Sequence, residues 1–328
     1  MQKQYYEQPY RRPRTTQTRN TRKRQNASKS PMYFFIMAKI ITVTICTAVA
    51  IIAFFIFWQP ETSEAAYYPT LAAAPAPQPT IPASQPIAHP SGPSLTSTSR
   101  TTLTDTGYLK LVNRNLAVNR STDYSQMVSA WPTVPVRATD ITLHQTALNA
   151  IAALLESAHA PFFVTSGYRD ATRQHELYES AVNRAYVLPP GHSEHQLGLA
   201  ADILVMDIPM GQMSGTPEAL WLAENAWRYG LILRYPYGTE HITGVAYEPW
   251  HFRYVGRIHA WYMTANNMVL EEYLEYLQNN NGFNVILDGV NYYVMYQQPE
   301  NGRLYVPTYL PFNMSTSNKG GYIITAWR

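Results

Sequence analysis

The stretch GHSEHQLGLAADI, residues 191–203, combines a histidine and a carboxylate with small residues. His195 and Asp202 stand seven positions apart, and the glycine and alanine residues between them would let the backbone and a metal ion approach closely. The apolar residues 203–205 follow and predict a buried strand. A carboxylate at the entrance of such a strand is costly to bury unless a cation or hydrogen bonds pair with it. The stretch therefore predicts a core strand that carries a metal ligand.

A second stretch, EPWH at residues 248–251, offers partners for this site. If the residues after it form an alternating strand, His251 points to the face opposite its aromatic neighbours. Two imidazoles and one carboxylate are a usual ligand set of hydrolytic zinc, which keeps one position for water. We therefore expect His195, Asp202 and His251 to bind Zn²⁺, with Glu248 beside them as the general base. The alternative is that these histidines are structural and Glu248 is an exposed loop acid.

An arginine stands at the end of another predicted strand, in SGYRD at residues 166–170. In that place Arg169 could bind a substrate carboxylate with its two-pronged guanidinium group. Asp170 has the side chain preferred at a helix N-cap, so the helix after it would carry Gln174. The alternative for Arg169 is an ordinary surface arginine paired with Asp170 or Glu176.

The start of the 328-residue chain differs in composition from the rest. Residues 1–32 carry nine basic residues against Glu7 and few apolar ones, so they cannot fold alone. Residues 33–58 are apolar apart from Lys39, and their last 19 residues carry no charge, close to the length that crosses a bilayer. The positive-inside rule puts the basic side in the cytoplasm. We expect a basic cytoplasmic tail and a single transmembrane anchor, with a cleaved signal peptide as the alternative.

Residues 59–102 are rich in Pro, Ala, Ser and Thr and lack helical or strand periodicity. We expect a semi-rigid extracellular linker there. Because the basic residues behind the net charge of +3 gather in the tail, the folded part is mildly acidic, and nucleic-acid binding is not expected. The single cysteine excludes a disulfide within the chain.

Residues 103–278 have the mixed patterning of an α+β domain. We expect a small antiparallel sheet flanked by helices, with zinc in a cleft on the sheet. One helix is predicted within residues 143–159, and a long final helix over residues 257–278. Between them, Thr216 is expected to cap a helix that has Pro217 in its first turn and ends at Gly230. Besides residues 203–205, the predicted strands are residues 162–164, 231–235 and 250–255.

Residues 279–328 change to alternating strands. Asp288 and Gly289 form a strong hairpin signal between two such runs. Residues 305–306 and 322–324 could add two more strands. We expect a small C-terminal β appendage that packs on the main domain, since about fifty residues bury little core by themselves.

Four segments together resemble the VanY-type D-alanyl-D-alanine carboxypeptidases, zinc enzymes of the superfamily shared with VanX dipeptidases and the hedgehog signalling domain. The segments are SGYRD (166–170), PPGHSEHQLGLAADI (189–203), ENAWRYGLILRYP (224–236) and EPWHFRYVG (248–256). The resemblance keeps their order and spacing and runs from about Tyr108 to the C-terminus. The departures from the family pattern are small. His192 stands where relatives often carry Tyr, Thr or His, and we do not expect it to be a ligand. Ala201 stands where relatives often carry a bulkier residue.

The resemblance implies roles for seven residues, position by position. They are the zinc ligands His195, Asp202 and His251, the catalytic base Glu248, the substrate-anchoring and polarising Arg169, and Gln174 and Ser193 at the substrate terminus.

The implied function is a membrane-anchored zinc D,D-carboxypeptidase, which would remove the terminal D-alanine from peptidoglycan stem peptides ending in D-Ala-D-Ala or from their precursors. The resemblance also suggests a role in glycopeptide (vancomycin) resistance. Three alternatives stay open: an L,D-carboxypeptidase of tetrapeptide stems, an endopeptidase that cuts cross-links, and a non-catalytic wall-binding protein that keeps the metal for structure.

Overall fold

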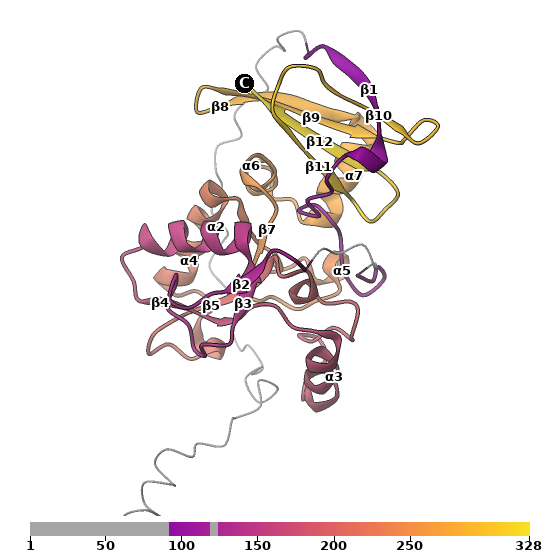
Figure 1. Ribbon diagram of the computed structural model, residues 1–328. Coiled ribbons are helices and arrows are strands. Elements are labelled where there is room, and N and C mark those ends of the chain that lie inside the picture. The colour runs from indigo at the N-terminus through magenta and orange to yellow at the C-terminus, as the bar shows by residue number, and fades with distance from the viewer. Residues whose placement is uncertain (1–91, 119–123) are drawn as a thin grey trace, which may run out of the picture. The chain divides into compact units, whose positions relative to one another are not determined.

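The structure is a computed structural model that describes residues 92–118 and 124–328 (Figure 1). All of these residues belong to one compact unit. The predicted cytoplasmic tail, the transmembrane anchor and most of the linker lie outside the described residues. Within the described ranges, no helix is both long enough and apolar enough to cross a membrane.

A four-stranded sheet lies at the centre of the predicted α+β domain, with the strand order β4-β5-β7-β6. Every neighbouring pair in it is antiparallel, which confirms the predicted small antiparallel sheet. All six residues of β5 are buried, as expected for a strand with a neighbour on either side and cover on both faces. The strands are β4 (Phe162–Ser166), β5 (Ala200–Val205), β6 (Leu231–Leu233) and β7 (His251–Tyr254).

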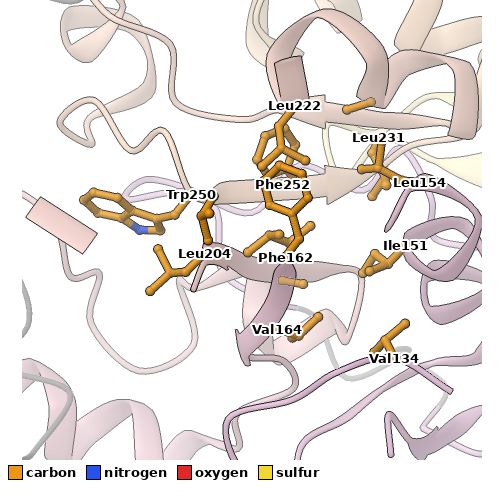
Figure 2. Close-up of a cluster of buried hydrophobic side chains, with 14 of the residues drawn as sticks. Val134, Ile151, Leu154, Phe162, Val164, Leu204, Leu222, Leu231, Trp250 and Phe252 are labelled. Atoms are coloured by element: carbon orange, nitrogen blue, oxygen red, sulfur yellow. The ribbon is translucent and has the colours of Figure 1, made fainter. Parts of the chain in front are cut away.

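Helices α2 (Gln145–Glu156) and α4 (Pro217–Asn225) supply apolar side chains to a core shared with this sheet. Ile151 and Leu154 of α2 and Leu222 of α4 are each 0% exposed and belong to one cluster with strand residues such as Phe252 (Figure 2). Each such side chain contributes about 1.5–3 kcal/mol by burial. Because side chains alternate along a strand, the residues between these core positions on β5 and β7 face the opposite side of the sheet.

Side-chain caps fix where the helices begin. Asp170 accepts a hydrogen bond from the Arg173 N–H at 2.7 Å and caps α3 (Ala171–Ser180), and Thr216 caps α4 with Pro217 in its first turn, so both predicted caps are confirmed. His144 caps α2 at the end of a short hairpin. That hairpin consists of β2 (Met127–Ser129) and β3 (Thr142–His144), and the short α5 (Glu240–Thr243) precedes β7.

The predicted single helix over residues 257–278 is wrong. The structure has two helices, α6 (Arg257–Ala265) and α7 (Leu270–Asn280). Asn267 between them has φ of +52°, a left-handed conformation that no α-helix contains. Glu272 then accepts a hydrogen bond from the Val269 N–H at 3.0 Å and so starts α7 separately.

The C-terminal residues form a β module, residues 282–328, around an antiparallel sheet of order β11-β12-β9-β8. The predicted hairpin is confirmed, because Asp288 and Gly289, with φ of +50° and +80°, form the two-residue turn between β8 and β9. The strands of this sheet are β8 (Gly282–Leu287), β9 (Val290–Gln297), β11 (Phe312–Thr316) and β12 (Tyr322–Trp327), and β10 (Arg303–Pro307) belongs to a separate two-stranded sheet.

The partner of β10 in its two-stranded sheet comes from the predicted linker. β1 (Leu95–Ser99) pairs antiparallel with β10, and Arg303 donates hydrogen bonds to the hydroxyl and the carbonyl of Ser97, both at 2.8 Å. The prediction that residues 59–102 lack regular structure is therefore wrong for residues 95–102, because β1 is followed by a 3-10 turn, Arg100–Thr102. A strand with mostly exposed side chains has no local apolar pattern, and it forms here because β10 supplies its hydrogen-bond partners.

The β module packs on α6 and α7, as expected for a small appendage. Ile323 of β12 and Val294 of β9 belong to one apolar cluster with residues of both helices. His259 of α6 is hydrogen-bonded through Nδ1 to the Tyr273 hydroxyl of α7 at 2.6 Å and through Nε2 to the Thr325 hydroxyl of β12 at 2.9 Å. One buried imidazole thus joins three elements.

Candidate metal centre

A glycine turn brings His195 back towards β5. His195 lies in a short 3-10 turn, Glu194–Leu197, which ends at Gly198 with φ of +69°. This left-handed backbone angle requires glycine there, and a Cβ would also lie 2.4 Å from the Met127 sulfur, so the Met127 side chain would have to move. The chain then enters β5, and the small residues quoted from the sequence do allow this close approach.

Strand register brings the next two ligands together. Asp202 on β5 lies directly opposite His251 on β7, and opposite Ser166 on β4 on the other side. Residues opposite each other in an antiparallel pair have Cβ atoms about 4.5–5.5 Å apart. Asp202 and His251 therefore share the face of the sheet that points away from the core of Figure 2.

A tight turn sets Glu248 beside His251. The His251 N–H donates to the Glu248 carbonyl at 3.2 Å, which closes the turn through Pro249 and Trp250. The Glu248 N–H donates to the Tyr235 carbonyl at 3.1 Å and ties the turn to the segment after β6. Glu248 Oε2 lies 3.5 Å from His251 Nδ1. The spacing of three residues in EPWH is therefore the spacing of one β-turn.

The three predicted ligands converge on one point. Candidate ligand atoms of His195, Asp202 and His251 all lie within 4.8 Å of one another. His195 Nε2 is 3.5 Å from Asp202 Oδ2, and His251 Nδ1 is 3.1 Å from Asp202 Oδ1. Ligands of a tetrahedral zinc ion are about 3.3 Å apart, from bond lengths of about 2.0–2.1 Å. The donor types and the spacing both fit Zn²⁺.

The second nitrogen of His195 supports the same assignment. Its Nδ1 lies 2.6 Å from the Gly167 carbonyl oxygen, which can only accept, so Nδ1 carries the hydrogen. The lone pair of Nε2 is then left facing Asp202. A metal-binding histidine usually donates its other N–H to such an acceptor, which fixes the ring and its tautomer.

The surroundings of the site shift the pKa values of His195 and His251 in opposite directions. Burial and the nearby charge of Arg169 lower the pKa of His195 to about 4, so it is neutral at pH 7. Burial also opposes a charge on His251, but its hydrogen bonds with Asp202 and Glu194 and the negative charges around it raise its pKa to about 9. A metal ion that binds at pH 7 must displace this proton from His251.

The pKa of the Glu248 carboxylate lies close to neutral pH. It is 3% exposed, and burial raises its pKa to about 8, with the charges of His251 and Arg169 opposing the shift and Asp202 adding to it. A cation held by the three ligands would lower this pKa again, because an opposite charge favours the carboxylate. Glu248 can therefore take up and release a proton near neutral pH.

The predicted substrate residues lie around the same pocket. Arg169, Gln174 and Ser193 line it together with the three metal ligands and Glu248. Arg169 donates to the Ser166 hydroxyl at 3.2 Å, and Gln174 donates to the Leu188 carbonyl at 2.6 Å. The structure thus brings together all seven residues predicted from the sequence. His192 is not among them, since its Nδ1 contacts the Asn113 carbonyl at 2.8 Å.

Other pocket residues were not predicted. Tyr235 lines the pocket with its ring centre 4.8 Å from that of His251, and burial holds the pKa of its hydroxyl well above the usual value, so it stays a donor. The sequence offered one signal for Tyr235 as a pocket residue: it stands after a predicted apolar strand and directly before a proline. The pocket wall is completed by four residues with apolar surfaces: Tyr186, Val187, Leu188 and Val245.

A buried ion network behind the ligands was also missed. Glu194 is 1% exposed and lies between Arg234 and Arg253, at 2.7 Å and 2.9 Å. Burial would raise the pKa of Glu194, but the two arginines outweigh burial and hold it well below its usual value. Arg234 also binds Glu271 on α7 with two hydrogen bonds, at 2.7 Å and 2.9 Å. Positive and negative groups alternate, which is the arrangement that makes buried charges tolerable.

Comparison with known proteins places this site in a family. The family model described as VanY, D-alanyl-D-alanine carboxypeptidase, matches residues 140–257, which contain every ligand and pocket residue named above. Residues 140–257 form a VanY-family domain. The predicted membership in the group of VanX and VanY zinc peptidases is thereby confirmed.

Two curated relatives match this VanY-family domain and its surroundings. The D-alanyl-D-alanine carboxypeptidase of Enterococcus faecium is 41% identical over 167 residues, which cover 51% of this chain and 54% of that protein. The bifunctional D-Ala-D-Ala dipeptidase and D-Ala-D-Ala carboxypeptidase VanXYC of Enterococcus gallinarum is 39% identical over 126 residues, which cover 35% of this chain and 66% of that protein. The chain thus spans about half to two-thirds of the length of these relatives.

A solved structure extends the likeness beyond the family match. The vancomycin resistance D,D-dipeptidase VanXYg, in complex with a D-Ala-D-Ala phosphinate analog, superposes with a TM-score of 0.62 and 28% identity. The superposition covers 72% of this chain and 99% of that chain. The mixed fold with small antiparallel sheets is therefore shared with the VanX/VanY group.

Proposed function

We propose that this protein is a zinc-dependent D,D-carboxypeptidase that removes the terminal D-alanine from peptidoglycan stem peptides or their precursors. The observation that carries the proposal is the position of Glu248. A buried carboxylate with a pKa raised to about 8 lies 3.5 Å from a nitrogen of the His-Asp-His group and shares a pocket with a buried arginine. A metal held only for structure needs no such base.

The residues of the chain divide the chemistry between them. Zinc, when bound, lowers the pKa of a water molecule and polarises a carbonyl group. Glu248 accepts the proton of the attacking water and later gives it to the amine nitrogen that leaves. The peptide bond breaks, a carboxylate is left on the stem, and free D-alanine is released.

The substrate-facing residues favour a peptide with a free C-terminus. Arg169 offers a positive charge to the terminal carboxylate or to the oxyanion that forms during attack. Gln174 Oε1 is buried and has no hydrogen-bond partner within the described residues, so it can accept from a substrate N–H. Val187 and Val245 give the pocket an apolar wall that suits an alanine methyl group.

The test compares Glu248→Ala with the wild-type protein on a stem pentapeptide that ends in D-Ala-D-Ala. We expect D-alanine release to fall at least about 100-fold, as for loss of a general base, while bound zinc and the melting temperature stay unchanged. Glu224→Ala is the matched control, because Glu224 is exposed on α4 and is not among the residues that line the pocket. Release by Glu248→Ala at the wild-type rate would contradict the mechanism.

The same assay separates the alternatives. Loss of one D-alanine from a tetrapeptide stem, but not from the pentapeptide, would show an L,D-carboxypeptidase. Release of the two halves of a cross-linked dimer without free D-alanine would show an endopeptidase. Binding of wall fragments with no turnover would show a non-catalytic wall-binding protein.

The location and the physiological role are part of the proposal. The basic residues 1–32, the apolar residues 33–58 and the Pro-rich residues that follow support an anchored enzyme whose catalytic domain lies outside the membrane, where peptidoglycan is found. Removal of the terminal D-alanine would destroy the D-Ala-D-Ala end that vancomycin-type antibiotics bind. Equal vancomycin susceptibility of cells that express the wild-type protein and the Glu248→Ala variant would rule out a resistance role.

A further inference from the structure

Glu194 stands next to the ligand His195 in the sequence, yet its side chain contacts the other histidine ligand. Glu194 Oε2 lies 3.6 Å from His251 Nε2. Both atoms are buried, and neither has a hydrogen-bond partner within residues 92–118 and 124–328, because 3.6 Å is just longer than a hydrogen bond. Glu194 Oε2 and His251 Nε2 are therefore each available to pair with the other.

The two oxygens of Glu194 have different surroundings. Oε1 is held by Nε of Arg234 at 2.7 Å and by Nη1 of Arg253 at 2.9 Å. Two guanidinium groups at one oxygen leave little room for a further donor there. Oε2 remains available to accept a hydrogen bond from His251, and a charged acceptor makes such a bond stronger.

Further hydrogen bonds fix the side-chain orientations of Arg234 and Arg253. Arg234 uses its two remaining nitrogens to bind Glu271 on α7, at 2.7 Å and 2.9 Å. Arg253 donates through Nη2 to the carbonyls of Tyr108 and Lys110, both at 3.0 Å. The direction in which Glu194 presents Oε2 is therefore set by backbone and side-chain groups outside the metal site.

This arrangement decides which nitrogen of His251 faces the metal. A histidine that carries its hydrogen on Nε2 offers a lone pair only on Nδ1. Nδ1 is the nitrogen that faces the other ligands, at 3.1 Å from Asp202 Oδ1. We propose that Glu194 is a positioning residue that accepts the Nε2–H of His251 and so directs Nδ1 at the metal. The inference rests on the proposed function only in taking a zinc ion to be bound by this site.

A purely structural role predicts something different. In that case Glu194 would serve only as a counter-ion for two buried arginines, and any loss of charge in the network would act alike. Glu271 offers the matched control, since it binds the same Arg234 and takes part in none of the ion pairs of His251 within the described residues. The variants Glu194→Gln and Glu271→Gln each remove one negative charge from the network and keep the size of the side chain.

The test measures zinc affinity of the full-length variants by competition with a chelator. In Glu194→Gln the amide oxygen stays with the arginines, so an NH₂ group faces Nε2, and the hydrogen of His251 moves to Nδ1. We expect a zinc dissociation constant about 10–100-fold higher than in the wild-type protein, as for other partners of metal ligands. Glu271→Gln should change it less than about 3-fold. Equal losses in both variants would overturn the proposal.

Nitrogen-15 NMR of the zinc-loaded wild-type protein keeps the proposal falsifiable even if Glu194→Gln does not fold. We expect His251 to show a metal-bound Nδ1 and a slowly exchanging hydrogen on Nε2. A metal-bound Nε2 would overturn the proposal. Neither measurement depends on turnover, so a protein that binds zinc in this way but releases no D-alanine would contradict the proposed function and leave the role of Glu194 standing.

Discussion

Glu248 and Glu194 are two buried carboxylates around the same histidine, and their surroundings separate their roles. The charge of Arg169 opposes the effect of burial on Glu248 but does not outweigh it, so the pKa of Glu248 is raised to about 8. Glu194 contacts two arginines, which keep it charged. A site with two carboxyl groups pushed in opposite directions can use one to move protons and the other to hold a ligand.

Gly167 is a residue whose replacement would disturb both the fold and the metal ligand. A Cβ there would lie 2.4 Å from the Thr142 carbonyl oxygen, and the Gly167 carbonyl itself accepts the hydrogen bond of His195. We expect Gly167→Ala to lower the free energy of unfolding by about 1–3 kcal/mol. We also expect zinc binding to weaken about 10-fold or more, because the acceptor that orients His195 shifts.

Urea unfolding and chelator competition measure the two effects of Gly167→Ala. Gly92→Ala is the control, since nothing lies within 4 Å of a Cβ at that position. Wild-type zinc affinity in a destabilised Gly167→Ala protein would show that the carbonyl does not orient His195.

The ligands could be predicted from the sequence because their chemistry is local. His195, Asp202 and His251 stand in short motifs, and the spacing of Glu248 to His251 is that of one turn. Glu194 stands in the same motif, but its role could not be predicted because it depends on its partners. These lie 40 residues away at Arg234 and further on at Arg253. Pairing across such separations is decided by the fold, so an acid in a loop is all that the sequence shows.

The elements between the metal site and the β module meet at His259. Its two hydrogen bonds join α6 to α7 and to β12, and burial lowers its pKa to about 3. In the unfolded chain the same histidine has a pKa of about 6.5. The folded protein therefore holds His259 neutral over a range in which the unfolded chain binds a proton.

The sign of the resulting pH dependence follows from this difference. Above about pH 6.5 both states are neutral at His259, and its contribution to stability is complete. As the pH falls from about 6.5 towards 3, only the unfolded chain gains the proton, so this residue costs up to about 1.4 kcal/mol of stability per pH unit. We expect His259→Gln, which keeps the size and one hydrogen bond but does not titrate, to be less stable at pH 7.5 and less sensitive to acid.

Urea unfolding at pH 7.5 and at pH 5 measures this difference between His259→Gln and the wild-type protein. The comparison of the two proteins removes the effect of other groups that titrate in the same range. An equal loss of stability in both proteins would show that His259 is not the acid-sensitive contact.

Helix boundaries at this level were only partly predictable. The caps at Asp170 and Thr216 are local and were predicted correctly. The break at Asn267 was not, because the residues on either side have helical spacing and each forms a helix. The left-handed Asn267 ends the first helix, and both helices pack in a cluster shared with the β module, which no local pattern records.

At the scale of the whole chain, the linker and the folded unit meet inside a sheet. β1 is paired with β10 over five residues, and Arg303 binds Ser97 twice. The anchored location that we propose would therefore place the tether at the β module and not at the metal site. The composition of residues 59–102 predicted a spacer but could not show where it ends, because the partner strand lies about 200 residues further along the chain.

Two shortened proteins test this boundary and the proposed anchor together. A protein without residues 1–91 keeps β1, and we expect it to be recovered in the soluble fraction, to melt like the full chain and to release D-alanine from a soluble pentapeptide at the same rate. A protein without residues 1–102 loses the pairing with β10, and with net hydrogen-bond contributions of about 0.5–1.5 kcal/mol each we expect a loss of about 1–3 kcal/mol of stability. Cell fractionation and urea unfolding measure these outcomes. Full-length protein in the soluble fraction would contradict the anchor, and equal stability of the two shortened proteins would show that β1 is a passive end of the linker.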